Sequence, residues 1–153
     1  MKPIVIAALA TLAAAPAFAD DIIVNSADIK WGAVPPVLPK GGKIAVLYGN
    51  PFKPGPYTVR LMMPSNYKIA PHWHTQDENL TIISGTLVLG MSDKMDKKME
   101  HPLKAGGYHF LPGKRHHYAI AKGQTVVQVS GEGPFDINYL NPADDPSKAA
   151  MKQ

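Results

Sequence analysis

The sequence predicts an all-β protein whose strands form a closed barrel or two facing sheets. Apolar and β-branched residues gather in about nine short runs, a number typical of a sandwich or barrel. The 15 prolines and 13 glycines separate these runs, and almost no stretch has a helical pattern. No internal repeat is present in the sequence. We therefore expect one barrel and not a tandem pair.

Residues 1–19 are typical of a secretory signal peptide. Lys2 precedes an apolar stretch over residues 4–15, which is too short to span a bilayer, and a small-x-small cleavage site ends at Ala19. We expect cleavage after Ala19, a periplasmic or secreted mature protein, and no membrane attachment after cleavage. The remaining residues 20–153 are enough for one domain with a single core.

The composition limits the chemistry and the partners. The chain has no cysteine, which argues against thiolate zinc sites, iron–sulfur clusters and copper(I), so a metal would be held by nitrogen and oxygen. The net charge of +4 is spread along the sequence without a dense basic run among aromatic residues. This pattern argues against nucleic acid as a partner. A modest preference for small anionic ligands is compatible with it.

Residues 20–40 predict an extended arm outside the barrel. After a short strand candidate at 22–25, the segment contains three prolines, which a central strand does not tolerate. Trp31 and Leu38 would leave apolar surface in water if the arm were a mobile leader. We expect the arm to lie over the barrel or across to a partner, with Trp31 as its anchor, and we expect a homodimer.

Residues 43–48 and 57–63 predict the first two strands of a barrel that spans residues 41–141. Alternation in the second strand places Arg60 on the face opposite Val59. If Arg60 pointed inward, its planar guanidinium would suit the carboxylate of an acidic substrate, which makes Arg60 a candidate catalytic residue. An outward arginine is the favoured alternative, because charged residues are seldom buried.

Residues 71–85 predict half of a metal site. His72 and His74 lie two apart, so on a strand both imidazoles leave the same face. Glu78 follows four residues later, where a further strand begins, and adds a carboxylate oxygen to the two nitrogen ligands. Alone, the pattern also fits a chance group of surface residues.

Gly85 separates the strand candidates 79–83 and 86–91. A glycine here supplies the positive φ of a tight hairpin, so we expect the chain to reverse direction at Gly85. The charged segment 92–101 that follows predicts a loop or a helical turn that closes one end of the barrel.

A second element downstream raises the probability of a metal site. Gly106 and Pro112 bracket the apolar run 108–111, and His117 stands five residues beyond the proline. This element offers a third imidazole after a strand and a turn.

The rest of the chain continues the β pattern and then loses it. Residues 125–130 and 135–140 predict two more strands, divided by a turn that contains two glycines and a proline. Residues 142–153 form a polar tail with no core pattern.

Together, the two elements resemble the two motifs of the cupin superfamily. Four residues stand at the spacings of the first motif: His72, His74, Glu78 and Gly85. Asn66 replaces the leading glycine of that motif, a mild departure because asparagine tolerates positive φ. Three residues match the second motif: Gly106, Pro112 and His117. Lys114 and Ala121 replace its glycine and its asparagine.

The second motif leaves one choice of register open. Gly113 stands one position before the motif's glycine, and a turn made there would shift the chain by one residue and make His116 the ligand. The spacing from Pro112 favours His117. The face of His117 also carries the small Ala119 and Ala121, which leave room for a ligand.

The resemblance implies a cupin double-stranded β-helix, or jelly-roll, barrel with one divalent ion held by four side chains. These side chains are His72, His74, Glu78 and His117. Three neutral imidazoles and a carboxylate leave the ion one net positive charge and, in octahedral geometry, two open positions. The sequence does not choose between manganese, iron, nickel, copper and zinc.

For function, the resemblance implies a dioxygenase, decarboxylase or isomerase that acts on a small, metal-chelating and possibly anionic molecule. His116 is a candidate general acid or base because its pKa range suits the task. The alternative is a non-catalytic secreted cupin that binds or senses a small ligand or metal, like the cupin parts of some zinc-binding anti-sigma factors.

Overall fold

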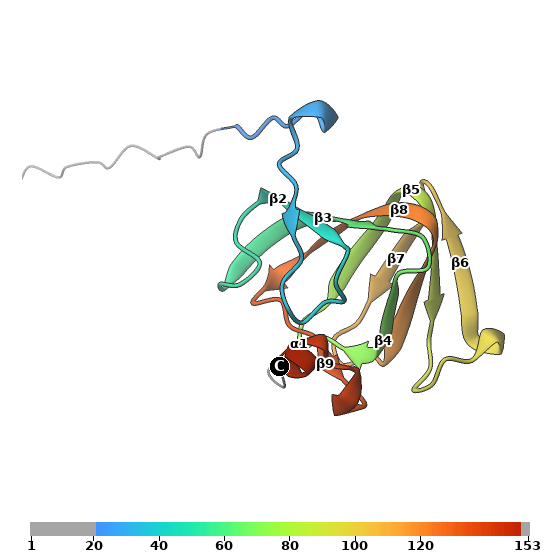
Figure 1. Cartoon of the computed structure of the whole chain (residues 1–153). Helices are drawn as coiled ribbons and strands as arrows, with labels where there is room; N and C mark the ends of the chain where they lie inside the picture. The colour runs from blue at the N-terminus through green and yellow to red at the C-terminus, as the bar shows by residue number, and fades with distance from the viewer. Residues whose placement is uncertain (1–20, 151–153) are drawn as a thin grey trace, which may run out of the picture.

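The computed structural model describes residues 21–150, which form the predicted all-β domain (Figure 1). The expected signal peptide, residues 1–19, lies outside the described residues. The nine strands are β1 (Gly32–Ala33), β2 (Lys43–Tyr48), β3 (Gly55–Met63), β4 (Lys68–Trp73), β5 (Glu78–Gly90), β6 (Glu100–Lys104), β7 (Tyr108–Leu111), β8 (His117–Gly133) and β9 (Asn138–Tyr139). Short 3₁₀ turns occupy Ser26–Asp28, Lys97–Met99 and Pro142–Asp144, and a short helix α1 covers Pro146–Ala150. No helix among residues 21–150 has the length and apolar character needed to cross a membrane.

The two long strands β5 and β8 run antiparallel to each other through both halves of the barrel (Figure 1). The first part of β5 pairs with the end of β8 and with β7, and its second part pairs with the start of β8 and with β6. Beyond β8, strands β3 and β2 extend the first half, and β4 and β9 extend the second. Two facing sheets joined by shared bent strands form the barrel, and the predicted cupin fold is confirmed.

The core lies between these sheets and follows the alternation of the strands. In β3, Tyr57, Val59, Leu61 and Met63 are buried, whereas the intervening residues are half-buried. Strands β5 and β8 add further aliphatic side chains, among them Leu80, Leu87, Val127 and Val129. Because one face of every long strand is apolar, the barrel fills its own interior without helices.

The expected hairpin at Gly85 is wrong. Gly85 has a positive φ of 79°, but β5 continues through it and stays paired with β8 on both sides. The register shifts on both sides of Ser84, which marks a bulge. A bulge and a tight hairpin both use a glycine with positive φ, so the residue alone does not distinguish them. Here the bulge bends β5 from one sheet to the other.

Some strand assignments differ from the expectation. Residues 22–25 form no strand. The charged segment 92–101 contains the expected helical turn, as a 3₁₀ turn, but its last two residues already begin the strand β6. Of residues 135–140, only Asn138–Tyr139 pair. Strand β6 pairs on one side only, with β5, and such an edge strand tolerates the Pro102 that obscured its pattern.

Residues 32–40 pack against the barrel, whereas the chain before them extends away from it (Figure 1, blue). Gly32–Ala33 pair with the outer edge of β2, and Leu38 is buried in the core cluster. The hydroxyl of Tyr139 donates to the carbonyl of Val37 at 2.8 Å. Trp31 is half-buried, and Leu38 is the more deeply buried of the two.

Candidate metal centre

Strands β4 and β8 bring His72 and His117 together. His72, in β4, stands directly opposite His117, the first residue of β8. His74 follows just after the end of β4, where two-residue periodicity returns its side chain to the inner face. The three histidines are 2–5% exposed. Pairing across an antiparallel ladder therefore unites the two sequence elements on one inner surface.

The three imidazoles converge closely enough to share an ion. Each offers a nitrogen, and these three nitrogens lie within 4.8 Å of one another. The ring centroids are 4.1 Å apart for His72 and His117, 4.9 Å for His72 and His74, and 5.0 Å for His74 and His117. Such a group is of the size that a single metal ion holds together.

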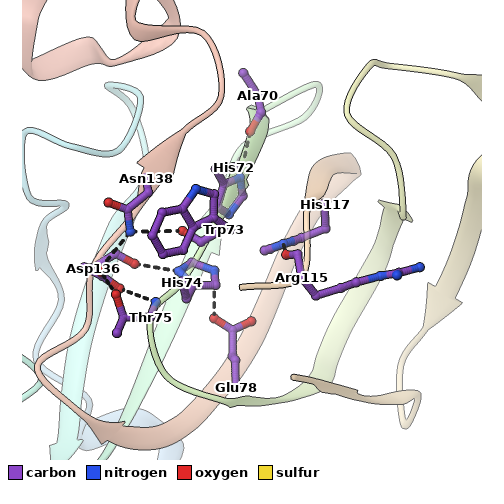
Figure 2. Close-up of polar contacts among 10 residues, drawn as sticks. All are labelled: Ala70, His72, Trp73, His74, Thr75, Glu78, Arg115, His117, Asp136 and Asn138. Atoms are coloured by element: carbon purple, nitrogen blue, oxygen red, sulfur yellow. Dashed lines mark hydrogen bonds and ion pairs between the residues drawn. The ribbon is translucent and has the colours of Figure 1, made fainter. Parts of the chain in front are cut away.

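Each imidazole is oriented by a backbone carbonyl (Figure 2). The Nδ1 atoms of His72, His74 and His117 lie 2.7, 2.6 and 3.1 Å from the carbonyl oxygens of Ala70, Asp136 and Arg115, respectively. A carbonyl only accepts, so each Nδ1 carries the proton and each Nε2 keeps its lone pair. This second layer of hydrogen bonds is the usual support of metal-binding histidines.

Burial keeps two of these imidazoles neutral. Removal from water, with the other histidines nearby, lowers the pKa of His72 well below its ordinary value. Burial likewise lowers the pKa of His117 to about 3, with His74 as a further cause. At neutral pH both rings are therefore unprotonated, as a metal ligand must be.

Glu78 reaches the histidines from the opposite sheet. It begins β5, is 7% exposed, and places its Oε2 atom 3.4 Å from Nε2 of His74 (Figure 2). It lies beside the cluster of three nitrogens and not within it. A buried carboxylate is costly without a cation, and within residues 21–150 no lysine or arginine forms an ion pair with it. A divalent ion between Glu78 and the imidazoles would meet that need.

The register of the second motif follows from Lys114. Lys114 has φ 63° and Asn66 has φ 62°, so both substituted positions keep the left-handed backbone that the motif's glycines would adopt. Gly113 does not take over the turn. A Cβ on Gly113 would lie 2.7 Å from the carbonyl oxygen of Thr75, so close packing explains this glycine. The chain is therefore not shifted, and His117 faces inward.

His116 and Arg60 lie outside the pocket. Nδ1 of His116 is 2.8 Å from Oδ1 of Asp93, in an exposed pair. Nε of Arg60 donates to Oε1 of Gln128 at 3.1 Å, on the face of β3 opposite its buried side chains. The structure therefore brings neither of these two candidate catalytic residues to the histidines.

The histidines and Glu78 line a cavity of about 60 Å³ inside the barrel. The other lining residues are apolar: Pro35, Leu38, Ile44, Pro51, Phe52, Val59, Leu61, Met63, Ile69, Leu80, Leu87, Leu89, Ala119, Val127, Val129, Phe135 and Ile137. A water molecule needs about 10–15 Å³ of such space, so an ion and a small ligand have room here. The cavity thus offers one polar end and apolar walls.

Sequence reasoning missed the segment between β8 and β9. Asp136 accepts hydrogen bonds from the backbone and hydroxyl of Thr75 at 2.8 and 2.6 Å, while its carbonyl orients His74 (Figure 2). These hydrogen bonds, with one from Asn138, lower the pKa of Asp136 despite its partial burial. The ring of Phe135 lies 5.1 Å from His74. No local signal marks these residues, because their partners lie far away in the sequence.

Comparisons with known proteins agree with this architecture. Residues 15–138 match the family model described as a domain of unknown function, DUF4437. The polyketide cyclase RemF of Streptomyces resistomycificus is 17% identical, with a TM-score of 0.67 over 84% of this chain and 91% of the cyclase. A proposed acetylacetone dioxygenase of Methylibium petroleiphilum is 16% identical, with a TM-score of 0.66 over 86% of this chain and 88% of that protein.

A third similar structure is KdgF from a Halomonas species. It is 16% identical, with a TM-score of 0.55 over 71% of this chain and 91% of KdgF. No curated protein matches the chain in sequence. At these identities, the similar structures show a shared fold.

Proposed function

We propose, from the premise that this chain belongs to the DUF4437 family and has the cupin fold, that it is a metal-dependent enzyme. Its substrate would be a small molecule that chelates the metal. The reaction class is that of a mononuclear dioxygenase, decarboxylase or isomerase.

The observation that carries this proposal is the set of three buried imidazoles whose Nδ1 protons are all engaged by backbone carbonyls. Burying these three polar rings costs free energy, and their Nε2 lone pairs remain available to a metal ion that binds beside Glu78. A bound divalent ion would supply a Lewis acid with open positions for a substrate or for dioxygen. Glu78 would be a further ligand or, beside the ion, a proton acceptor.

The similar structures support an enzyme in general terms. The descriptions of two of them, RemF and the Methylibium protein, name a cyclase and a dioxygenase. Each matches more than four-fifths of this chain. The reaction of either protein is a starting point for assays of this one.

Metal analysis of the purified mature protein tests the proposal. We expect about one equivalent of a divalent metal, the content of a mononuclear site. The His72→Ala/His74→Ala double variant should lose the metal, whereas His101→Ala, on the exposed surface of β6, should keep it. Full metal occupancy in the double variant would refute the site.

Oxygen uptake and product analysis then test the reaction. The metal-loaded protein should turn over at least one member of a panel of β-dicarbonyl, catechol-like and dicarboxylate compounds. The His72→Ala/His74→Ala double variant should show no turnover, and added metal should not restore it.

One observation favours the alternative of a non-catalytic cupin that binds or senses a ligand or metal. Apart from the three histidines and Glu78, the cavity lining contains no ionisable side chain that would serve as general acid or base. Tight binding of a panel compound without turnover would support this alternative.

We also propose that the protein acts in the periplasm or outside the cell. The support is the signal-peptide pattern of residues 1–19. Mass spectrometry of the protein from the producing cell should show a chain that begins at Asp20. A folded product that retains residues 1–19 would contradict this.

A further inference from the structure

We propose that the natural ligand of the cavity has a compact apolar body and chelates the metal through oxygen atoms as a monoanion, and that dianions such as dicarboxylates are rejected. This inference rests on the proposed function and specifies its substrate class. Enolates of β-dicarbonyls and hydroxy-ketones belong to this class, and malonate and oxalate do not.

The walls of the cavity are apolar. All lining residues other than the three histidines and Glu78 are aliphatic, aromatic or proline, and none has a side-chain hydrogen-bond donor. A second carboxylate or a hydroxyl that points away from the metal would lose water and find no partner. The part of the ligand beyond the chelating oxygens must therefore be apolar, and its burial adds to affinity.

The net charge of a metal held by these side chains favours a monoanionic ligand. Three neutral imidazoles and the Glu78 carboxylate leave a divalent ion one net positive charge. A monoanionic chelator neutralises that charge, whereas a dianion would leave an uncompensated negative charge in an apolar cavity. Lysine and arginine are absent from the described lining, so no side chain would compensate it.

The position of Arg60 removes the one cation that the sequence offered for an acidic substrate. The guanidinium of Arg60 donates a hydrogen bond to Gln128 on the outer face of β3. Its chain neighbours Val59 and Leu61 line the cavity. Turning Arg60 inward would require the whole strand to change face, because adjacent side chains on a strand point in opposite directions.

The mouth of the cavity is apolar as well. Phe52 lines the cavity and is 57% exposed, so it lies where the cavity meets solvent. A hydrogen bond of 2.9 Å from its backbone N–H to Oδ1 of Asn50 holds the turn. The backbone N–H of Phe135 donates to the carbonyl of Pro51 at 2.6 Å and ties this turn to the wall beside His74. A ligand that enters beside this turn would pass the ring of Phe52 before it reaches the three histidines.

A matched pair of chelators tests the proposal. Acetylacetone and malonate both form six-membered chelates through two oxygens, and they differ in carrying two methyl groups or two further oxygens. The mature protein is loaded with cobalt(II) under nitrogen, and its visible spectrum reports ligand binding without turnover. Each dissociation constant is divided by that of aqueous cobalt(II) with the same compound, which removes the intrinsic difference between the chelators.

We expect the protein to favour acetylacetone by a normalised factor of at least about ten, the size of a single misplaced polar contact. The variant Phe52→Arg, which adds a cation at the mouth, should narrow this factor several-fold. The control Phe52→Gln removes the ring without adding charge and should not improve malonate binding.

The outcomes separate this inference from the proposed function. A protein that takes up no cobalt would refute the metal site, and with it the ligand class. A protein that takes up cobalt but binds malonate as well as acetylacetone, after normalisation, would refute the ligand class and leave the metal site standing. Unchanged selectivity in Phe52→Arg, with cobalt bound, would also contradict the charge argument.

Discussion

The inner and outer surfaces of the barrel use the same residue types for different purposes. His117 is buried among imidazoles, whereas its neighbour His116 is half-buried on the outer surface and paired with Asp93. Glu78 is buried beside His74, whereas Asp77 is exposed and accepts a hydrogen bond from the backbone of Gly113. Strand phase, and not side-chain chemistry, therefore decides which ionisable residues face the candidate metal centre.

Substitutions of the adjacent residues His116 and His117 should give the largest difference in metal affinity between the outer and inner surfaces. His117→Ala removes an inner ligand and should weaken metal affinity by more than about 100-fold, because loss of supporting residues alone costs 10–100-fold. His116→Ala should leave affinity within about two-fold, since the loss of an exposed ion pair is a small effect. Competition with a colorimetric chelator measures both. Equal losses in the two variants would show that inner and outer positions are not distinct.

The adjacent carboxylates Asp77 and Glu78 should show the same contrast between outer and inner positions, with a smaller difference in metal affinity. Glu78→Gln keeps the shape of the side chain but removes the charge beside the ion, so metal affinity should fall by about ten-fold or more. Asp77→Asn should keep the metal and cost about 1 kcal/mol of stability through its weakened bond to Gly113. Metal titration and chemical denaturation separate the two. Retention of wild-type affinity by Glu78→Gln would place the carboxylate outside the site.

The metal-free protein should lose stability as the pH falls, because inner histidines resist protonation. The pKa of His117 is lowered to about 3, while the unfolded chain has a histidine pKa of about 6.5. The unfolded state therefore binds more protons between these values. The stability contribution is complete above about pH 6.5 and is lost as the pH falls toward about 3.

Urea denaturation between pH 4 and pH 8 measures this pH dependence. His117→Gln should flatten it, whereas His116→Gln on the outer surface should keep the wild-type slope. Identical slopes for wild type and His117→Gln would contradict the assignment.

The smallest effect on stability is expected for substitutions of the apolar residues at the outer end of the N-terminal arm. Ile22 and Ile23 are 58% and 85% exposed, and we propose that they contact a second copy of the chain. Ile22→Lys/Ile23→Lys should shift a dimer toward monomer without changing the melting temperature by more than a few degrees. Asp21→Lys, exposed and adjacent, controls for added charge. Sedimentation of the wild type as a monomer at micromolar concentration would exclude this interface.

The sequence was enough to predict the fold class and the side chains that are candidates to hold a metal. Alternation with period two, glycine and proline between short apolar runs, and two histidine-containing motifs are local patterns, and local patterns survive without knowledge of distant contacts. The spacing from Pro112 also indicated His117, and the left-handed backbone of Asn66 and Lys114 agrees with the motif positions.

Tertiary structure alone decided which face of each strand is inner and which distant segments support the site. Alternation in β3 alone is compatible with Arg60 on either face. In the folded barrel Val59 and Leu61 pack in the core, so Arg60 faces outward. Gly85 became a bulge because β8 continues to pair with β5 beyond it. The carbonyl of Asp136 meets His74 only after the barrel closes. Each of these outcomes depends on residues far apart in the chain, whose proximity no local pattern encodes.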